Sequence, residues 1–341
     1  MIVEVHDRLA ALDRGEWNGV VAASGASVFY DYDLLAAYEA HPLEPDLARA
    51  YLALRDGGGR LVGVLPAYVQ DPMNAFFHLP EGDPTRDLGG TRGVVTHFWH
   101  CYDSGLPLRP ELAPDEKREA LAAVAAGLAD VARRHGACGC GFLDVDARRP
   151  EVAGLAELGF TVRPLADRFV LDLTPFATMD DYLAGHHASR RRDLKRQRRR
   201  AEEEGLAITV REPPVAGLDE VVALCRGTAA RYGGAAYYPE ETFGAFLADC
   251  GDTLRVIAVE AAGTLVGTAA CFLHGGTFHA WAGGMRYDLS HASPYTLVFH
   301  EILRYAIESG AHTLEGGRAN ARFKERLGLR PLPLVTAMRR V

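Results

Sequence analysis

One sequence pattern occurs twice in this chain, with its landmarks in the same order. Three pairs of segments carry the repeat: 59–63 (GRLVG) and 263–267 (GTLVG), 129–137 and 303–311, and 157–160 (ELGF) and 326–329 (RLGL). The first pair lies each time in the return strand of an expected hairpin. Because three landmarks recur in one order, we expect a duplicated α/β unit, with the functional site in a cleft between the halves.

Length and composition suit two globular domains. The 341 residues exceed what one ordinary core organises, and 48% hydrophobic with 24% charged residues is typical of a globular chain. No apolar run approaches the roughly 20 residues of a membrane span, and the first residues lack a signal peptide. We therefore expect a cytoplasmic protein with no membrane partner. Six scattered cysteines predict reduced thiols and no metal site.

The order of expected elements is the same in both halves. The first half predicts a hairpin (48–55 and 60–70), a long loop (71–93), a helix (114–135), a short strand (141–145) and a helix (150–158). The second predicts a hairpin (254–260 and 264–274), a strand (277–285), a helix (294–309) and a short strand (313–315). This order indicates a mixed α/β fold with domains at 1–165 and 166–341. A strand at 168–173 would link them.

Residues 189–204 form one strongly basic segment. Eight of the eleven residues from 190 to 200 are Lys or Arg, and three glutamates follow at 202–204. Arginines 198–200 are placed to pair with these glutamates at i,i+4, which indicates a self-paired surface helix. The alternative is a surface that follows RNA phosphates. Asp193 is the one acidic residue close in sequence to the cations of this surface. These cations are Arg190, Arg191, Arg192, Lys195 and Arg196.

The segment 315–328 contains the densest group of candidate site residues. Glu315 precedes two glycines, which allow the backbone to approach a ligand closely. Arg318, Arg322 and Lys324 are suited to stabilising an oxyanion or holding a phosphate. The alternative is a glycine turn before an ordinary helix with outward charges.

Further candidates are scattered over both halves, and each also has a purely structural interpretation. His279 and Trp281 share one face of an expected strand, as core residues or as a pocket wall. Tyr237 and Tyr238 precede Pro239 and either line a pocket or pack at a helix start. Arg86 and Arg92, in the expected loop of the first half, are candidate contacts for an anionic acceptor.

With these residues in place, the chain resembles the Fem-like tandem acyltransferases. The resemblance rests on the duplicated unit, the basic stretch SRRRDLKR at 189–196 and the ending RFKERLG at 322–328. It implies two domains of the GNAT (Gcn5-related N-acetyltransferase) type. It also implies transfer of an aminoacyl group from aminoacyl-tRNA to the amine of a small molecule, a peptide-like natural product or a cell-wall-type precursor.

The resemblance also implies roles for individual residues. Phe323 and Lys324 match a phenylalanine–lysine pair at the acyl-transfer centre, with Lys324 as oxyanion stabiliser. Arg318 or Arg322 would hold the terminal phosphates of the donor, and the basic helix would hold the tRNA acceptor stem. We expect His291, at the start of the second-half helix, as proton acceptor because histidine titrates near neutrality.

The sequence also bears on the donor. GNAT proteins that use acetyl-CoA carry an [RQ]xxGx[GA] loop, whose N–H groups hold the pyrophosphate at a helix N-terminus. In the equivalent segment, 286–294, Arg286 fits this pattern but Leu289 replaces a glycine. We therefore expect no coenzyme A and no other cofactor. Two alternatives stay open: N-acylation of a small amine from acyl-CoA or another thioester, and a non-catalytic RNA- or polyanion-binding protein on a degenerate GNAT fold.

Overall fold

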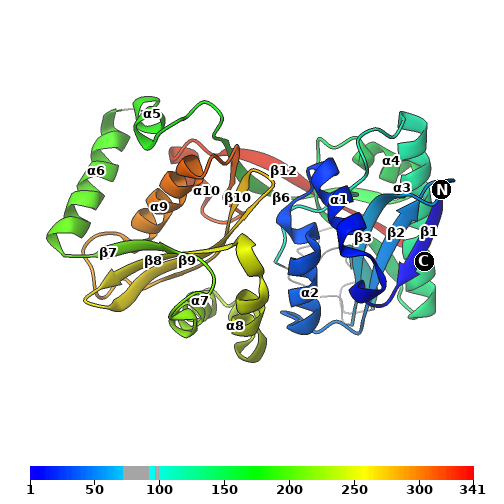
Figure 1. The fold of residues 1–341 in the computed structure, drawn as a ribbon, viewed down its shortest axis with the longest axis horizontal. Coiled ribbons are helices and arrows are strands. Elements are labelled where there is room, and N and C mark those ends of the chain that lie inside the picture. Colours follow the sequence, from blue (N-terminus) through cyan, green and yellow to red (C-terminus); the bar gives the residue numbers. More distant parts are fainter. Residues whose placement is uncertain (72–91, 97, 99, 187) are drawn as a thin grey trace. The chain divides into compact units, whose positions relative to one another are not determined.

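The computed structural model describes residues 1–71, 92–96, 98, 100–186 and 188–341 of the chain (Figure 1). The chain divides into two compact units, called unit 1 (Met1–Arg168 and Leu332–Val341) and unit 2 (Phe169–Pro331). Each combines a mixed sheet with helices, so the expected mixed α/β class is confirmed. Most of the loop expected at 71–93, including Arg86, lies outside the described residues.

The sheet of unit 1 has the strand order β1-β2-β3-β4-β5-β12. Its strands are β1 (Ile2–His6), β2 (Ala48–Arg55), β3 (Leu61–Gln70), β4 (Gly93–Thr96), β5 (Gly139–Asp146) and β12 (Arg330–Arg340). The β4–β5 pair is parallel, whereas β1–β2, β2–β3, β3–β4 and β5–β12 are antiparallel. The helices are α1 (Arg14–Ser24), α2 (Tyr32–Ala40), α3 (Pro114–Arg134) and α4 (Glu151–Glu157), with short 3₁₀ turns at Leu9–Ala11 and Val28–Tyr30.

Unit 2 has the strand order β6-β11-β10-β9-β8-β7. Its strands are β6 (Thr161–Asp172), β7 (Ala207–Arg211), β8 (Leu254–Ala261), β9 (Thr264–His274), β10 (Thr277–Met285) and β11 (Thr313–Glu315). The β10–β11 pair is parallel and its neighbours are antiparallel. The helices are α5 (Met179–Ala184), α6 (Ala188–Glu203), α7 (Leu218–Arg231), α8 (Glu240–Asp249), α9 (Pro294–Glu308) and α10 (Ala321–Arg326), with 3₁₀ turns at Ala235–Tyr237 and Gly251–Thr253.

Helices cover both faces of the unit 2 sheet (Figure 1). Gly284 lies against the backbone of α7, whereas its neighbour Met285 belongs to the core that α9 covers. Because successive strand residues point to opposite faces, α7 and α9 lie on opposite sides of β10. The core on the α9 side is built from apolar residues of the sheet and of α5, α6 and α9.

The internal repeat is a structural repeat. In the β2–β3 hairpin Gly63 lies opposite Leu54, and the register shifts at the next pair. In the β8–β9 hairpin Gly267 lies opposite Val259, with the same shift at the next pair. The two GxLVG-type segments therefore build the same hairpin with the same bulge.

The other landmarks are matching helix ends. Gly136 and Gly310 follow α3 and α9 with φ of 62° and 72°, and Gly159 and Gly328 follow α4 and α10 with φ of 81° and 84°. Glycine adopts this left-handed conformation without the steric cost of a Cβ, which is why these helices end at glycine.

The last strand of each repeat crosses into the opposite unit, β6 from Phe169 onward and β12 from Leu332 onward. Residues 170–172 of β6, which closes the first repeat, pair with β11 of unit 2. β12, which closes the second repeat, pairs with β5 of unit 1 over residues 334–340. The chain therefore passes from one unit to the other twice, and the C-terminal residues 332–341 belong to unit 1.

Candidate active site

The centre of the candidate site is Lys324, which α10 carries into the interior of unit 2. The side chain is buried although α10 is a short, mostly exposed helix. Its Nζ lies 5.6 Å from the centre of the Phe169 ring. Within the described part of the chain, no hydrogen bond or ion pair engages this ammonium group. It is therefore a buried cation held mainly by packing and by an aromatic face.

Burial changes the acidity of this side chain. Desolvation lowers the pKa of Lys324 to about 8, and the charge of the Glu315 carboxylate opposes that shift. Glu315 is itself buried, and its Oε1 accepts a hydrogen bond of 2.9 Å from the N–H of Gly317. A lysine and a carboxylate in a dry environment thus lie beside a glycine turn, as catalytic groups often do.

The strands position this pair where the parallel ladder of unit 2 ends. β10 and β11 pair from Thr277–Thr313 to His279–Glu315, and β10 continues to Met285. Beyond Glu315 the chain stays attached to β6, because Gly316 donates to the Phe169 carbonyl at 2.8 Å and Phe169 donates to the Gly317 carbonyl at 3.1 Å. The end of a parallel ladder is a common place for a ligand in α/β folds.

Other parts of unit 2 pack closely against the backbone of Gly316. A Cβ at this position would lie 2.6 Å from the Leu329 side chain and 3.6 Å from Cδ of Lys324. Gly316 is therefore required mainly by the close approach of the Leu329 side chain and of the Phe169 carbonyl oxygen, and Gly317 by its left-handed φ of 71°.

Phe323 packs beside Lys324 in an aromatic group on the α9 side. Its ring centre lies 4.7 Å from that of Tyr295 and 5.4 Å from that of Phe299. The Tyr295 hydroxyl accepts a 3.0 Å hydrogen bond from the Asn320 amide, and Asn320 precedes α10 with a left-handed φ of 60°. These contacts fix the start of α10, and with it the position of Lys324.

His279 occupies the register position beside Glu315. It is buried on β10, paired with Glu315 across the parallel ladder and with Phe272 of β9 on the other side. Paired residues point to the same face of a sheet, so His279 and Glu315 share a face.

Trp281 lies in an aromatic cluster with α8. The ring centres of Phe272, Phe246, Phe243 and Tyr238 lie 5.2, 5.7, 6.1 and 6.3 Å from that of Trp281. Tyr237 extends the cluster at 5.0 Å from Tyr238. Trp281, Tyr237 and Tyr238 are thus part of a packed aromatic cluster, and Trp281 lies two residues from His279 on β10.

The remaining candidates come from both units. Arg318 is half-buried just after the double glycine, and Arg322 is exposed on α10. The ring of His291 is exposed, and no contact among the described residues joins it to Lys324. Arg92 belongs to unit 1, where its guanidinium donates to Asp71 at 2.8 Å and to the His135 carbonyl at 2.7 Å. Arg86 lies outside the described residues.

The basic segment is a helix, α6, which begins at Ala188 and ends at Glu203. The expected self-pairing is only partly correct. Arg199 meets Glu203 at 3.3 Å and Arg196 pairs with Asp193. Arg191 donates to the His186 carbonyl at 3.1 Å, whereas Arg192 and Lys195 are exposed and outside the described ion pairs. Arg190 is helical, but its side chain is outside the description.

The expected pairing of Glu204 with Arg200 is not formed. Glu204 follows the end of α6, where its carboxylate bonds to the loop before α9, not to Arg200.

A hollow of about 370 Å³ separates α6 from α5 and α9 and is lined in part by Lys195, Arg198 and Arg304. His300 at its floor is buried, and burial together with the charge of Arg198 lowers the pKa of His300 to about 4. The histidine is therefore neutral at physiological pH, and the charges around this hollow are mixed, since Asp180 and Glu308 line it together with the lysine and arginine side chains.

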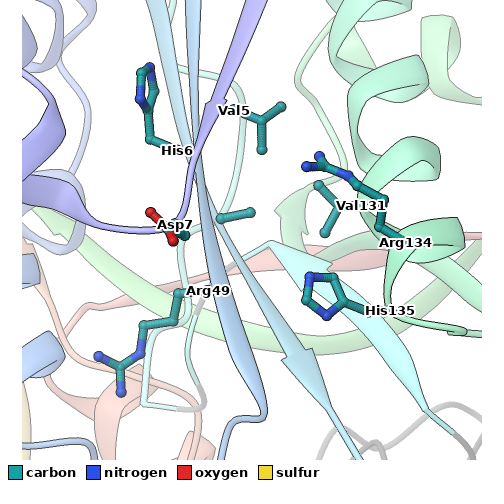
Figure 2. A pocket seen from close by; sticks show the side chains of 8 residues that line it. Val5, His6, Asp7, Arg49, Val131, Arg134 and His135 are labelled. Carbon is teal, nitrogen blue, oxygen red and sulfur yellow. The ribbon is translucent and has the colours of Figure 1, made fainter.

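Unit 1 contains a hollow of about 330 Å³ that none of the sequence candidates lines (Figure 2). Figure 2 shows Arg134, the last residue of α3, and His135, which follows it, on one side of β1, and His6 and Arg49 on the other. Arg49 is already engaged, since it bonds Asp46 at 2.5 Å and the Glu39 carbonyl at 2.7 Å.

The described residues offer neither a metal site nor a membrane span. No three or more His, Cys, Asp or Glu side chains among them are arranged to hold a metal ion. None of the helices described is both long and apolar enough to cross a bilayer.

Comparison with protein families gives a match for one part of this chain. Residues 188–325 match the acetyltransferase (GNAT) domain family, a segment that includes α6, β10, α9 and Lys324. No curated protein is similar enough in sequence to count as a relative.

Solved structures match over almost the whole chain. FemX shares 12% identity at a TM-score of 0.68, covering 99% of this chain and 97% of FemX. The C-terminal domain of a putative lysylphosphatidylglycerol synthetase from Agrobacterium fabrum shares 15% at 0.61, covering 97% and 92%. A tandem GNAT protein from the clavulanic acid biosynthesis pathway shares 17% at 0.58, covering 99% and 98%.

These likenesses confirm, at the level of the fold, the resemblance seen in the sequence. Each of the three structures is matched over nine-tenths or more of its length, so the shared architecture extends beyond the GNAT domain at 188–325. The chain has the tandem-GNAT fold of these structures, and its residues 188–325 match the acetyltransferase (GNAT) domain family.

Proposed function

We propose that this chain is an aminoacyltransferase that moves an aminoacyl group from aminoacyl-tRNA to the amine of a small molecule and forms an amide. The GNAT domain and the tandem-GNAT fold support an acyltransferase. The C-terminal domain of a putative lysylphosphatidylglycerol synthetase has a similar fold, and the product in the name of that protein contains a lysyl group. The sequence resemblance to the Fem-like family supports tRNA as donor.

The observation that carries the proposal is the buried ammonium group of Lys324 at the end of the β10–β11 ladder. A cation in a dry site stabilises a developing negative charge far better than one in water. Two glycines, Gly316 and Gly317, form the turn that follows Glu315. This is the arrangement that acyl transfer through a tetrahedral oxyanion requires.

The reaction needs little beyond positioning and charge stabilisation. The acceptor nitrogen attacks the ester carbonyl of aminoacyl-tRNA, and the negative charge that forms on the carbonyl oxygen is stabilised by the Lys324 ammonium group. The tetrahedral species collapses when the bond to the ribose oxygen breaks, and a proton lost by the amine ends on the released ribose hydroxyl. His291 is the proposed carrier of that proton, and Arg318 or Arg322 the proposed contact for the terminal phosphates.

The surface charge of unit 2 fits an RNA donor. Exposed cations of α6, among them Arg192 and Lys195, stand on a helix within the GNAT domain itself. A short row of such cations binds a phosphate backbone with an affinity that falls steeply with salt. We assign α6 to the acceptor stem of the tRNA, and Arg190, Arg191 and Arg196 to the same surface.

The direct test compares donors. Purified protein is incubated with radiolabelled aminoacyl-tRNA or with a panel of acyl-CoAs, in each case with a pool of small amines. We expect loss of label from tRNA with a new amide product, which identifies the amino acid. Turnover of an acyl-CoA with inert aminoacyl-tRNA would establish the thioester alternative. Binding of RNA without turnover of either donor would establish the non-catalytic alternative.

A further inference from the structure

The loop before α9 has its hydrogen-bond donors occupied by one glutamate. The carboxylate of Glu204 accepts from the backbone N–H of His291 at 3.1 Å and of Ala292 at 3.1 Å. It also accepts from the hydroxyl of Ser290 at 2.8 Å. One side chain thus satisfies three donors that face the N-terminal end of α9.

Two neighbouring donors, the N–H groups of Ser293 and Thr296, are satisfied as well. The N–H of Ser293 donates to Oε1 of Gln197 at 3.0 Å, and the N–H of Thr296 donates to the Ser293 hydroxyl at 3.4 Å. Pro294, the first residue of α9, has no N–H. Gln197 and Glu204 are seven positions apart, which is close to two helical turns, so both reach the loop from one side of α6.

Exposed N–H groups at the start of a helix form an anion-binding site, because they carry the positive end of the helix dipole. In unit 2 an anion is already bound there, and it is a side chain of the protein. A phosphate group can use these donors only if it displaces a carboxylate that is covalently fixed beside them. The fixed carboxylate competes at a high effective concentration and repels an incoming phosphate.

We propose that Glu204 is a specificity-determining residue: a built-in anion that closes the α9 loop to donors that need a diphosphate site, such as coenzyme A thioesters. Acyl donors that bind elsewhere are unaffected. The proposed function places tRNA, as such a donor, on α6. The inference extends the proposed function, and its test measures binding alone, so the two stand or fall separately.

The test measures binding of inorganic pyrophosphate and of coenzyme A to the whole chain by titration calorimetry. Wild type is compared with Glu204→Ala and Glu204→Gln, both of which remove the resident charge. We expect pyrophosphate to bind about tenfold more tightly to Glu204→Ala than to wild type, and about threefold more tightly to Glu204→Gln. Coenzyme A is expected to follow the same order.

Glu203→Ala is the matched control. Glu203 carries the same charge one position earlier but pairs with Arg199, not with the loop. We expect it to bind pyrophosphate as wild type does. An equal gain in Glu203→Ala would reduce the effect to net charge and overturn the proposal, as would tight coenzyme A binding by wild type or no gain in either Glu204 variant.

Failure of the proposed function would look different. If aminoacyl-tRNA proves inert while the Glu204 variants gain pyrophosphate binding, the function is wrong and the specificity role stands. If wild type transfers the aminoacyl group but the variants gain nothing, the function stands and the role of Glu204 is wrong. Circular dichroism of each variant shows whether the α6–α9 connection is needed for folding, and Glu204→Gln is the milder substitution for that purpose.

Discussion

Lys324 in unit 2 occupies the position that Leu155 occupies in unit 1. The N–H of Leu329 donates to the Lys324 carbonyl at 3.1 Å, and the N–H of Phe160 donates to the Leu155 carbonyl at 3.0 Å. Each bond closes a short helix just after a left-handed glycine, Gly328 or Gly159. Both side chains are buried, so the duplicated fold offers two equivalent interior positions and places a cation in one of them.

This relationship yields the first prediction. Lys324→Ala should lower kcat/KM for transfer by about 10²–10³, or roughly 2–4 kcal/mol, the cost of losing one oxyanion donor. Arg326→Ala is the control, since Arg326 is an exposed cation on the same helix. Steady-state kinetics with the preferred donor measures both. A loss below tenfold for Lys324→Ala, or an equal loss for Arg326→Ala, would contradict the oxyanion role.

The second prediction concerns the pH dependence of the rate. The pKa of Lys324 is about 8, so the ammonium form that stabilises an oxyanion is lost as pH rises through 8. We expect kcat/KM, which reports the free protein, to fall on the alkaline side with an apparent pKa near 8. A lysine that acted as a base would give the opposite result, a rise through the same range.

A variant of Glu315 shows whether Lys324 or another group that titrates near pH 8 causes the alkaline decrease in rate. The Glu315 charge raises the pKa of Lys324, against the effect of burial. Glu315→Gln should therefore move the alkaline limb to lower pH. A limb that stays in place in this variant would show that another group controls it.

The third prediction follows from linkage between protonation and stability. The pKa of Lys324 lies below its ordinary value of 10.5, so between about pH 8 and 10.5 the unfolded chain binds more protons than the folded one. Stability from this group therefore rises with pH across that window, and below pH 8 the charged form costs about 3 kcal/mol. Lys324→Met should raise the free energy of unfolding at pH 7, measured in urea, and remove the rise. No gain at pH 7 would contradict the burial of a charged lysine.

The sequence predicted the repeated elements well and the connections between the repeats poorly. Hairpins, the helix α9 and the short strand β11 follow from hydrophobic periodicity and glycine turns, and these signals are local. The linking strand expected at 168–173 is present as part of β6, whereas the pairing of β12 with β5 depends on which strand edge β12 meets, a long-range choice that no local pattern carries. β12 was not expected at all, because its prolines and arginines obscure the alternation of a strand.

The site shows the same division. Lys324 and Glu315 were proposed because they lie close in sequence to the double glycine, and Phe323 because it matches a phenylalanine–lysine pair of the Fem-like family. Phe169 and Tyr295, which contact the Lys324 segment, come from elsewhere in the chain and had no signal of their own. Glu204 was expected to pair with Arg200, since helical spacing shows which residues are neighbours but not that the helix ends at Glu203.

The fourth prediction concerns the basic helix. If α6 binds RNA, Arg192→Ala and Lys195→Ala should each weaken tRNA binding and reduce the slope of log K against log salt by about 1. Arg199→Ala should have a smaller effect because Glu203 already neutralises that charge at 3.3 Å. Filter binding over a range of salt concentrations gives the slopes. Equal slopes in all four proteins would remove α6 from the RNA-binding surface.

The last prediction tests the packing that positions β10. A Cβ at Gly284 would lie 2.5 Å from the backbone N of Cys225 on α7, whereas at Gly283 the nearest atom is the Thr268 carbonyl oxygen at 3.5 Å. Gly284→Ala must push α7 off the sheet, so it should cost about 1–3 kcal/mol or more, and Gly283→Ala under about 1 kcal/mol. Urea unfolding followed by tryptophan fluorescence compares them, with Trp281 on the same strand. Similar costs for the two alanines would mean that α7 does not approach β10 this closely.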